Sequence, residues 1–311
     1  MWHPVAVLQE PRAEPMPIRL LGDDLVLWRD AAGVLHAMVD RCPHRGAALS
    51  LGRVQRDRLV CAYHGWQFDG DGACRLIPAT PAFEPTARHA ASAHAVVEAH
   101  GLAWVQLEPS DVVLPAYAFD TERQVLCGPY DVATSAPRIV ENFLDIAHFG
   151  FVHDGGLGSH DHTETAPYHV QADDHGLEIT GVRVWQPQSN VAAAGGSEVD
   201  YRYQVLAPYA AALHKLPLAQ AGLRDTVALM VCPRDHESSR VWFVAAMSGI
   251  SADDNQVRAF QDAIFAQDQP VLESQRPRRL PLTAEVHGGA DRASVAYRRF
   301  LQDQGITFGV C

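Results

Sequence analysis

The strongest constraint on how this chain folds is a pair of short motifs, Cys42-Pro43-His44 and Cys61-Ala62-Tyr63-His64, with 16 residues between them. Thiolate and imidazole groups bind transition metals, and two of each complete a four-ligand set. Pro43, Gly46 and Gly65 suit tight loops around such ligands, since glycine allows a sharp backbone turn. We therefore predict an N-terminal domain in which two loops meet at one metal centre.

Two kinds of metal centre can use these ligands. Zinc sites usually pair like ligands within one loop, whereas each loop here offers one cysteine and one histidine. A Rieske [2Fe–2S] cluster fits if Cys42 and Cys61 hold one iron and His44 and His64 hold the other. Imidazole ligands would raise its potential to about −150 to +300 mV, against about −400 mV for plant-type clusters. We favour the Rieske cluster and keep structural zinc as the alternative.

The residues around these motifs read as short strands. Runs rich in leucine and valine are separated by turn residues such as the pair His100-Gly101. Because no long amphipathic helix occurs in this region, we predict an all-β domain over residues 1–115, with a linker at about Pro109–Pro115. The predicted strands are Pro17–Gly22, Leu25–Arg29, Leu35–Asp40, Arg58–Ala62, Trp66–Phe68, Ala95–Glu98 and Leu102–Leu107.

The rest of the chain, residues 116–311, mixes strands with helices and is predicted to be a second, α+β domain. A length of 311 residues fits two domains better than one. Apolar residues in Pro137–Val152 follow helical spacing, and further helices are expected at about 253–274 and 294–304. Strands are expected at Tyr168–Gln171, Leu177–Trp185, Val199–Leu206, Thr226–Cys232 and Val241–Met247, of which the last four could form one antiparallel sheet.

The predicted helix Pro137–Val152 leads to a second candidate metal site. His148 and His153 are five residues apart, which on a regular helix separates them by about 140°. Both can reach one metal only if the helix loosens or ends between them, and Gly150 is a plausible breaker. The alternative is that these are two incidental histidines in a chain that contains 16.

A carboxylate would complete a triad of two histidines and one acid, which leaves positions on iron open for oxygen. Asp268 is the candidate, because it lies between Ile264 and Leu272 at helical spacing, on the apolar stripe of its helix. An unpaired carboxylate there would be costly, and a neighbouring cation would relieve that cost. We interpret the nearby acids Asp262 and Glu273 as surface residues.

Taken together, these motifs resemble the oxygenase (alpha) component of the Rieske non-haem iron oxygenases. The resemblance points in particular to the branch of vanillate O-demethylases and caffeine-type N-demethylases. It runs from about Trp2 to the last helix and implies a catalytic domain of helix-grip (START-like) fold holding mononuclear Fe(II). The residues that carry it are Cys42–Ala47, Cys61–Phe68, Glu141–His153 and Asp268–Gln275.

The resemblance also implies roles for two residues of the first helix. Asp145 matches the acid that links His64 of one subunit to His148 of its neighbour and carries electrons between them. Asn142 matches a polar residue near the iron. Because the two metal sites of one chain are too far apart in this family, a homotrimer is implied.

The implied activity is oxidation of a C–H bond with O2, and we expect O- or N-demethylation of a small aromatic or heterocyclic substrate. The chain has no GxGxxG fingerprint, so electrons must come from a separate NAD(P)H-dependent reductase or ferredoxin. Ring or alkyl hydroxylation is the alternative, and a Rieske electron carrier or a zinc hydrolase is a more distant one. The aromatic residues Phe143, Phe149, Trp185 and Trp242 could line the pocket or be plain core.

Composition excludes several other classes. The net charge is −12, and no basic patch suggests nucleic-acid binding. No apolar run approaches the roughly 20 residues of a membrane helix, and no secretory signal is recognised at the start, so we expect a cytoplasmic protein. The six cysteines do not suggest a disulfide framework. Lys215 is the only lysine among 25 basic residues, and from this we infer no function.

Overall fold

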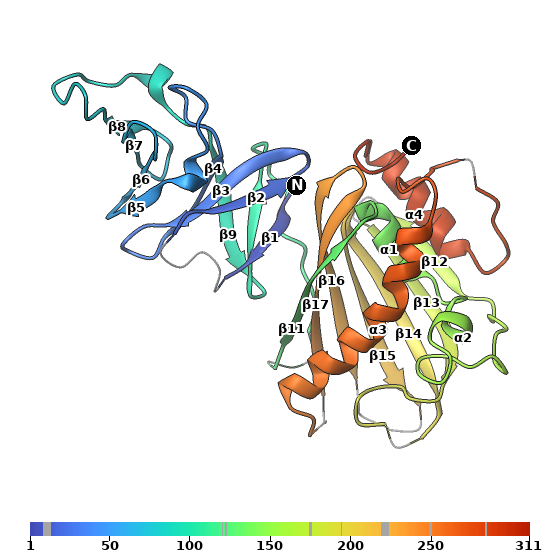
Figure 1. Cartoon of the computed structure of the whole chain (residues 1–311). Helices are drawn as coiled ribbons and strands as arrows, with labels where there is room; N and C mark the ends of the chain where they lie inside the picture. The colour runs from blue at the N-terminus through green and yellow to red at the C-terminus, as the bar shows by residue number, and fades with distance from the viewer. Residues whose placement is uncertain are drawn as a thin grey trace. The chain divides into compact units, whose positions relative to one another are not determined.

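The computed structural model divides into two compact units, Met1–Leu114 and Pro115–Cys311 (Figure 1). The structure describes residues 1–8, 14–119, 121, 123–173, 176–193, 195–218, 224–248, 251–283 and 285–311.

The larger sheet of the N-terminal unit is antiparallel, with strand order β1-β10-β9-β4-β3-β2. The β9–β10 hairpin turns at His100 and Gly101, whose φ angles of 53° and 77° are those of a tight hairpin turn, as predicted. The strands are β1 His3–Val7, β2 Met16–Leu20, β3 Asp23–Arg29, β4 Leu35–Val39, β9 Ala93–Ala99 and β10 Leu102–Gln106.

The smaller sheet of this unit has the order β5-β6-β7-β8 and supports the two cysteine loops. One loop follows β4, and the other connects β6 to β7. Cys42 and Cys61 belong to the same buried cluster as Trp28, Leu59 and Phe68, so the hydrophobic core reaches the base of both loops. The strands are β5 Arg53–Gln55, β6 Arg58–Val60, β7 Gln67–Phe68 and β8 Cys74–Leu76, and two 3-10 turns occur at Leu49–Leu51 and Ala87–His89.

The C-terminal unit is built on one antiparallel sheet of seven strands in the order β11-β17-β16-β15-β14-β13-β12. The four strands predicted to share a sheet do so, and the prediction of an α+β unit with an antiparallel sheet is confirmed. Sequence patterns missed β11 and β15; the latter is rich in alanine, which is a weak strand former. The strands are β11 Val125–Val132, β12 His169–Asp173, β13 Gly176–Gln186, β14 Ser197–Ala207, β15 Ala210–Pro217, β16 Asp225–Asp235 and β17 Ser238–Met247.

Helices cover one face of this sheet (Figure 1), and the long helix α3 crosses it. They are α1 Ala136–Leu144, α2 Phe149–Val152, α3 Asp254–Ser274 and α4 Arg292–Asp303. α3 begins at a capping box in which Asp253 accepts from the backbone N–H of Gln256. Arg298 of α4 donates to Glu141 of α1 at 2.6 Å, and this buried ion pair holds α1 against α4.

The predicted continuous helix Pro137–Val152 is wrong, because α1 already ends at Leu144. Asp145 has extended backbone angles, and its Oδ1 accepts from the backbone N–H of Ala147 at 2.9 Å. Such a side-chain turn competes with the next helical hydrogen bond. Gly150 is therefore not the breaker but lies inside α2, where a Cβ atom would come within 2.9 Å of the Ser159 carbonyl.

The helices of the described residues are all too short or too polar to cross a bilayer.

Candidate functional site

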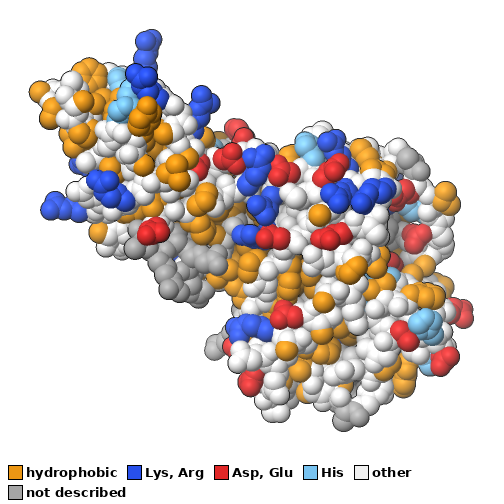
Figure 2. All heavy atoms as spheres, in the orientation of Figure 1, with side chains coloured by type: hydrophobic (Ala, Val, Ile, Leu, Met, Phe, Trp, Pro, Cys, Tyr) orange, Lys and Arg blue, Asp and Glu red, His pale blue; other side chains and the backbone are white. Residues whose placement is uncertain are grey.

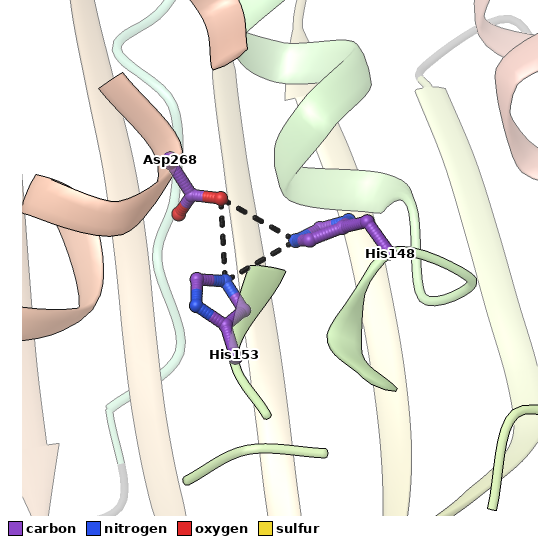
Figure 3. A group of neighbouring side chains, drawn as sticks. All are labelled: His148, His153 and Asp268. Atoms are coloured by element: carbon purple, nitrogen blue, oxygen red, sulfur yellow. Dashed lines mark hydrogen bonds and ion pairs between the residues drawn. The ribbon is translucent and has the colours of Figure 1, made fainter. Parts of the chain in front are cut away.

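Three predicted ligands of the C-terminal unit lie together (Figure 3). His148 lies at the start of α2 and His153 directly after its end, so one short helix spans the five-residue gap. Asp268 comes from the middle of α3 and is 7% exposed. Residues from two distant parts of the chain therefore meet at one point, as expected for Asp268 on the apolar face of its helix.

The distances between the ligand atoms test whether an ion fits. The Nε2 atoms of His148 and His153 are 3.2 Å apart. Asp268 Oδ1 lies 3.4 Å from the Nε2 of His148 and 3.2 Å from that of His153. Two donors about 2.1 Å from one ion are about 3.0 Å apart at a right angle and about 3.4 Å apart at a tetrahedral angle. The triangle therefore fits one transition-metal ion bound by two nitrogens and one oxygen.

Neighbouring side chains orient this triad. The Nδ1 of His148 hydrogen-bonds Asp145 Oδ2 at 3.2 Å, and the Nδ1 of His153 hydrogen-bonds Gln267 Oε1 at 2.8 Å. Both rings then turn their Nε2 atoms towards each other and towards Asp268 Oδ1, which is the usual arrangement for ligating histidines. Asn142 Nδ2 donates to Asp268 Oδ1 at 3.4 Å. Sequence reasoning missed Gln267, because neighbours on a helix point about 100° apart and adjacency to Asp268 says little.

The electrostatics of the triad also favour a cation. Burial alone would raise the pKa of Asp268, but hydrogen bonds from His148 and His153 lower it to about 2. Burial lowers the pKa of His148, but its contacts with Asp145 and Asp268 outweigh this and raise it to about 9. Without metal, a proton on His148 partly neutralises the buried carboxylate, and a bound dication would take over that role.

The two cysteine loops of the N-terminal unit share one backbone design. In each, the cysteine N–H donates to the carbonyl five residues later, at 2.8 Å for Cys42 and 2.9 Å for Cys61. In each, a glycine four residues after the cysteine donates back to the cysteine carbonyl. Gly46 and Gly65 have φ angles of 73° and 70°, a conformation that favours glycine. The motifs thus form two loops of matched backbone geometry, each carrying one cysteine and one histidine.

These loops separate the two ligand types. Cys42 and Cys61 are each 2% exposed, and burial, together with the proximity of Cys61, raises the pKa of the Cys42 thiol to about 11. His44 and His64 are exposed, with ring centroids 4.6 Å apart, and histidines are visible on the surface of this unit in Figure 2. Paired thiols inside and paired imidazoles outside fit a cluster whose two irons have different ligands.

A cavity with about 810 Å³ of open space, its mouth included, borders the metal triad. Its walls are mainly apolar, and they include Phe143 and Phe149 as the sequence suggested. The other two aromatic candidates do not line it: Trp242 is fully buried and Trp185 is 36% exposed. Mainly apolar walls with a few polar groups are typical of a pocket for a small organic ligand.

The same cavity has polar lining residues that sequence reasoning did not identify. Lys215 on β15, Asp225 on β16 and Asn190 before β14 all line it. Lys215 stands out in the sequence as the only lysine of the chain, but composition alone suggested no function for it. Its position facing Asp225 depends on the pairing of β15 with β16, and β15 itself was not predicted.

Residues 1–96 match the Rieske [2Fe-2S] domain, and residues 132–304 match the vanillate O-demethylase oxygenase C-terminal domain. The methylxanthine N1-demethylase NdmA of Pseudomonas putida is 32% identical, covering 97% of this chain and 88% of its own length. The probable methylxanthine N7-demethylase NdmC of Pseudomonas sp. (strain TJI-51) is 41% identical, covering 68% and 77%. The structure of Pseudomonas putida CBB5 NdmA with caffeine has a TM-score of 0.86 at 31% identity, over 97% of this chain and 89% of that one. The chain therefore belongs to the Rieske oxygenases, oxidoreductases that use O2 and carry a [2Fe–2S] cluster and a mononuclear iron.

Proposed function

We propose that this chain is the oxygenase component of an N-demethylase that acts on small N-methylated heterocycles of the methylxanthine class. The observation that carries the proposal is the His148–His153–Asp268 triangle, which borders a mainly apolar cavity. The relatives named as methylxanthine demethylases support this substrate class over O-methyl aromatics.

The proposed reaction oxidises an N-methyl group. One oxygen atom of O2 enters a methyl C–H bond, the other leaves as water, and NAD(P)H supplies two electrons through a separate reductase or ferredoxin. The N-hydroxymethyl product then breaks its C–N bond to release formaldehyde and leave an N–H group on the ring. We further propose a cytoplasmic location, where NAD(P)H is available.

We assign the cluster to residues 1–115, with Cys42, His44, Cys61 and His64 as ligands, and the iron to residues 116–311. In the latter, His148, His153 and Asp268 would hold Fe(II). When bound, the cluster would supply electrons and the iron would activate O2. The matched loops and the ligand triangle described above support these assignments.

The residues around the triad would position the metal ligands and the substrate. Asp145 holds His148 through Nδ1, while its own side chain stays 33% exposed. That exposure leaves its carboxylate free to meet His64 of a neighbouring copy, so we propose a homotrimer in which electrons cross between subunits. Asn142 donates to Asp268 and keeps the carboxylate oriented. Phe143 and Phe149 offer flat apolar surfaces that would hold a ring and exclude water.

Formaldehyde release tests the proposal. The iron-loaded protein would be supplied with NADH and a reductase of the same class and screened against methylxanthines and O-methyl aromatics. We expect formaldehyde and NADH consumption in equal amounts with an N-methyl heterocycle. An Asp268→Ala variant serves as the control that should release none. Substrate-dependent NADH and O2 consumption without formaldehyde would instead indicate a hydroxylase and contradict the proposal.

A further inference from the structure

One part of the cavity wall carries a buried pair of opposite charges. Lys215 of β15 and Asp225 of β16 face each other across the two strands and are 6% and 1% exposed. Charged side chains are rarely buried to this degree, because removing them from water is costly unless they are paired and hydrogen-bonded. Both residues line the cavity that borders the metal triad.

The hydrogen bonds of this pair are incomplete. Lys215 Nζ donates to the Ser189 carbonyl, but an ammonium has three N–H donors. Asp225 Oδ2 accepts from Asn190 Nδ2 at 3.1 Å, whereas Oδ1 is buried and has no hydrogen-bond partner among the described residues. The wall therefore offers a donor and an acceptor side by side.

The pair is separated from the metal triad by aromatic rings. Lys215 Nζ lies 5.7 Å from the centre of the Tyr201 ring, which is 6.0 Å from that of Phe149. The centre of the Phe149 ring in turn lies 5.0 Å from the centre of the His148 ring. A flat ligand in the cavity can therefore present one part to the metal ligands and another to Lys215 and Asp225.

We propose that Lys215 and Asp225 bind an unmethylated amide edge of the substrate ring, a carbonyl beside an N–H, away from the methyl group that is removed. The carbonyl would accept from Lys215 Nζ, and the N–H would donate to Asp225 Oδ1. This inference rests on the proposed N-demethylase function and narrows it. A methyl on that nitrogen removes the donor and sets carbon against a buried carboxylate, which disfavours binding.

The preferred substrates are then methylxanthines that keep a free N–H beside a carbonyl. Theobromine and 7-methylxanthine have such an edge, whereas caffeine carries methyl groups on both nitrogens, N1 and N3, that could provide it. A site built to hydrogen-bond a ligand N–H rejects the analogue that lacks it more strongly than an apolar pocket rejects an extra methyl. Discrimination against caffeine is therefore the measurable consequence.

Equilibrium binding without turnover tests the pair. Calorimetric titration of the holoenzyme under anaerobic conditions would compare 7-methylxanthine, theobromine and caffeine. We expect the wild-type protein to bind a ligand with a free N–H at least about tenfold tighter than caffeine. Equal or tighter binding of caffeine would overturn the proposal without need of any variant.

Variants then assign the effect to these residues. Asp225→Asn, which keeps the size and shape of the side chain, should weaken binding of the N–H ligands at least about tenfold. Lys215→Met should weaken it to the same degree. The affinity for caffeine should change by less than about threefold in both variants. Asp131→Asn is the matched control, because Asp131 also forms a cross-strand pair in this sheet, with Arg240, but outside the cavity. If both cavity variants retained the wild-type preference, the assignment would be wrong.

The two proposals can fail separately. Formaldehyde release without discrimination would leave the N-demethylase function standing and remove the role of Lys215 and Asp225. Discrimination that depends on the pair, but without formaldehyde, would support the recognition site and contradict the demethylase.

Discussion

The Nε2 atoms of His148 and His153 lie 3.2 Å apart, although the residues are separated by five positions in a segment that favours helix. This approach is possible because α1 ends at Leu144 and a new short helix, α2, begins at Phe149. The turn made by Asp145 therefore has two effects: it stops α1, and it brings its own carboxylate to His148.

Removing the acid of the triad should remove one metal and leave the other. In Asp268→Ala, we expect the loss of one iron per chain with unchanged acid-labile sulfide and unchanged cluster absorbance, since the cluster ligands lie in the other unit. Iron and sulfide analysis of the purified protein measures this. Glu273→Gln, one and a half turns further along α3, is the control that should keep its iron. Full iron content in Asp268→Ala would refute this ligand assignment.

Replacing Gln267 should weaken the iron site through His153. In Gln267→Leu, the Nδ1 of His153 loses its partner at 2.8 Å, so the ring is no longer held with Nε2 towards the metal. Partners of this kind contribute about 10- to 100-fold to metal affinity, and we expect a decrease in that range by competitive chelation. Gln269 donates instead to Glu273 and to the Asp131 carbonyl, so Gln269→Leu should leave the metal affinity unchanged.

Asp145→Asn should leave both metals bound and lower turnover about 10- to 100-fold, because the carboxylate that joins His148 is lost. Rapid mixing of the reduced protein with O2 and substrate would follow oxidation of the cluster, which we expect to slow by the same factor. Asp262→Asn on α3 is the control, since Asp262 bonds Tyr130 outside the triad. Normal turnover in Asp145→Asn would exclude the proposed electron route.

Mixed oligomers would show whether that route crosses between subunits. Asp145→Asn and His64→Ala subunits, each inactive alone, would be dissociated, mixed in equal amounts and reassembled. In a cyclic trimer, about one quarter of the interfaces would then join an intact His64 to an intact Asp145, so about a quarter of wild-type activity should return. No recovery in reassembled trimers would place both residues on a path within one chain.

Binding of the N–H ligands should weaken as the pH rises through about 8. Burial lowers the pKa of Lys215 to about 8, and the facing Asp225 of β16 only partly offsets this. Tyr201 of β14, whose pKa is raised by burial, stays neutral throughout, and Ser189 contributes only its carbonyl. An ammonium donates more strongly than an amine, so we expect affinity for theobromine, which stays neutral in this range, to fall up to about tenfold between about pH 7 and about pH 9. Lys215→Met should show a flat profile over this range, and an unchanged slope in that variant would contradict the assignment.

Local sequence by itself determined which candidate metal ligands lie close together in this protein. Cys42 with His44, and Cys61 with His64, lie within single loops, so their spacing alone indicates a four-ligand site. The apolar neighbours of Asp268 on α3 predicted its burial for the same reason, because one helix has a regular period. The all-β character of the first unit and the antiparallel sheet of the second also follow from short-range patterns of apolar and turn residues.

Tertiary structure alone decided how those ligands are supported and what faces them. Gln267 reaches His153 because α3 packs across the sheet, and the break after Leu144 depends on one side-chain turn that competes with a strong helical pattern. Lys215 and Asp225 face each other only through the register of β15 with β16. A strand shifted by one residue would point the opposite way, so no pattern within either segment could reveal that the only lysine of this chain lines the cavity beside the metal triad.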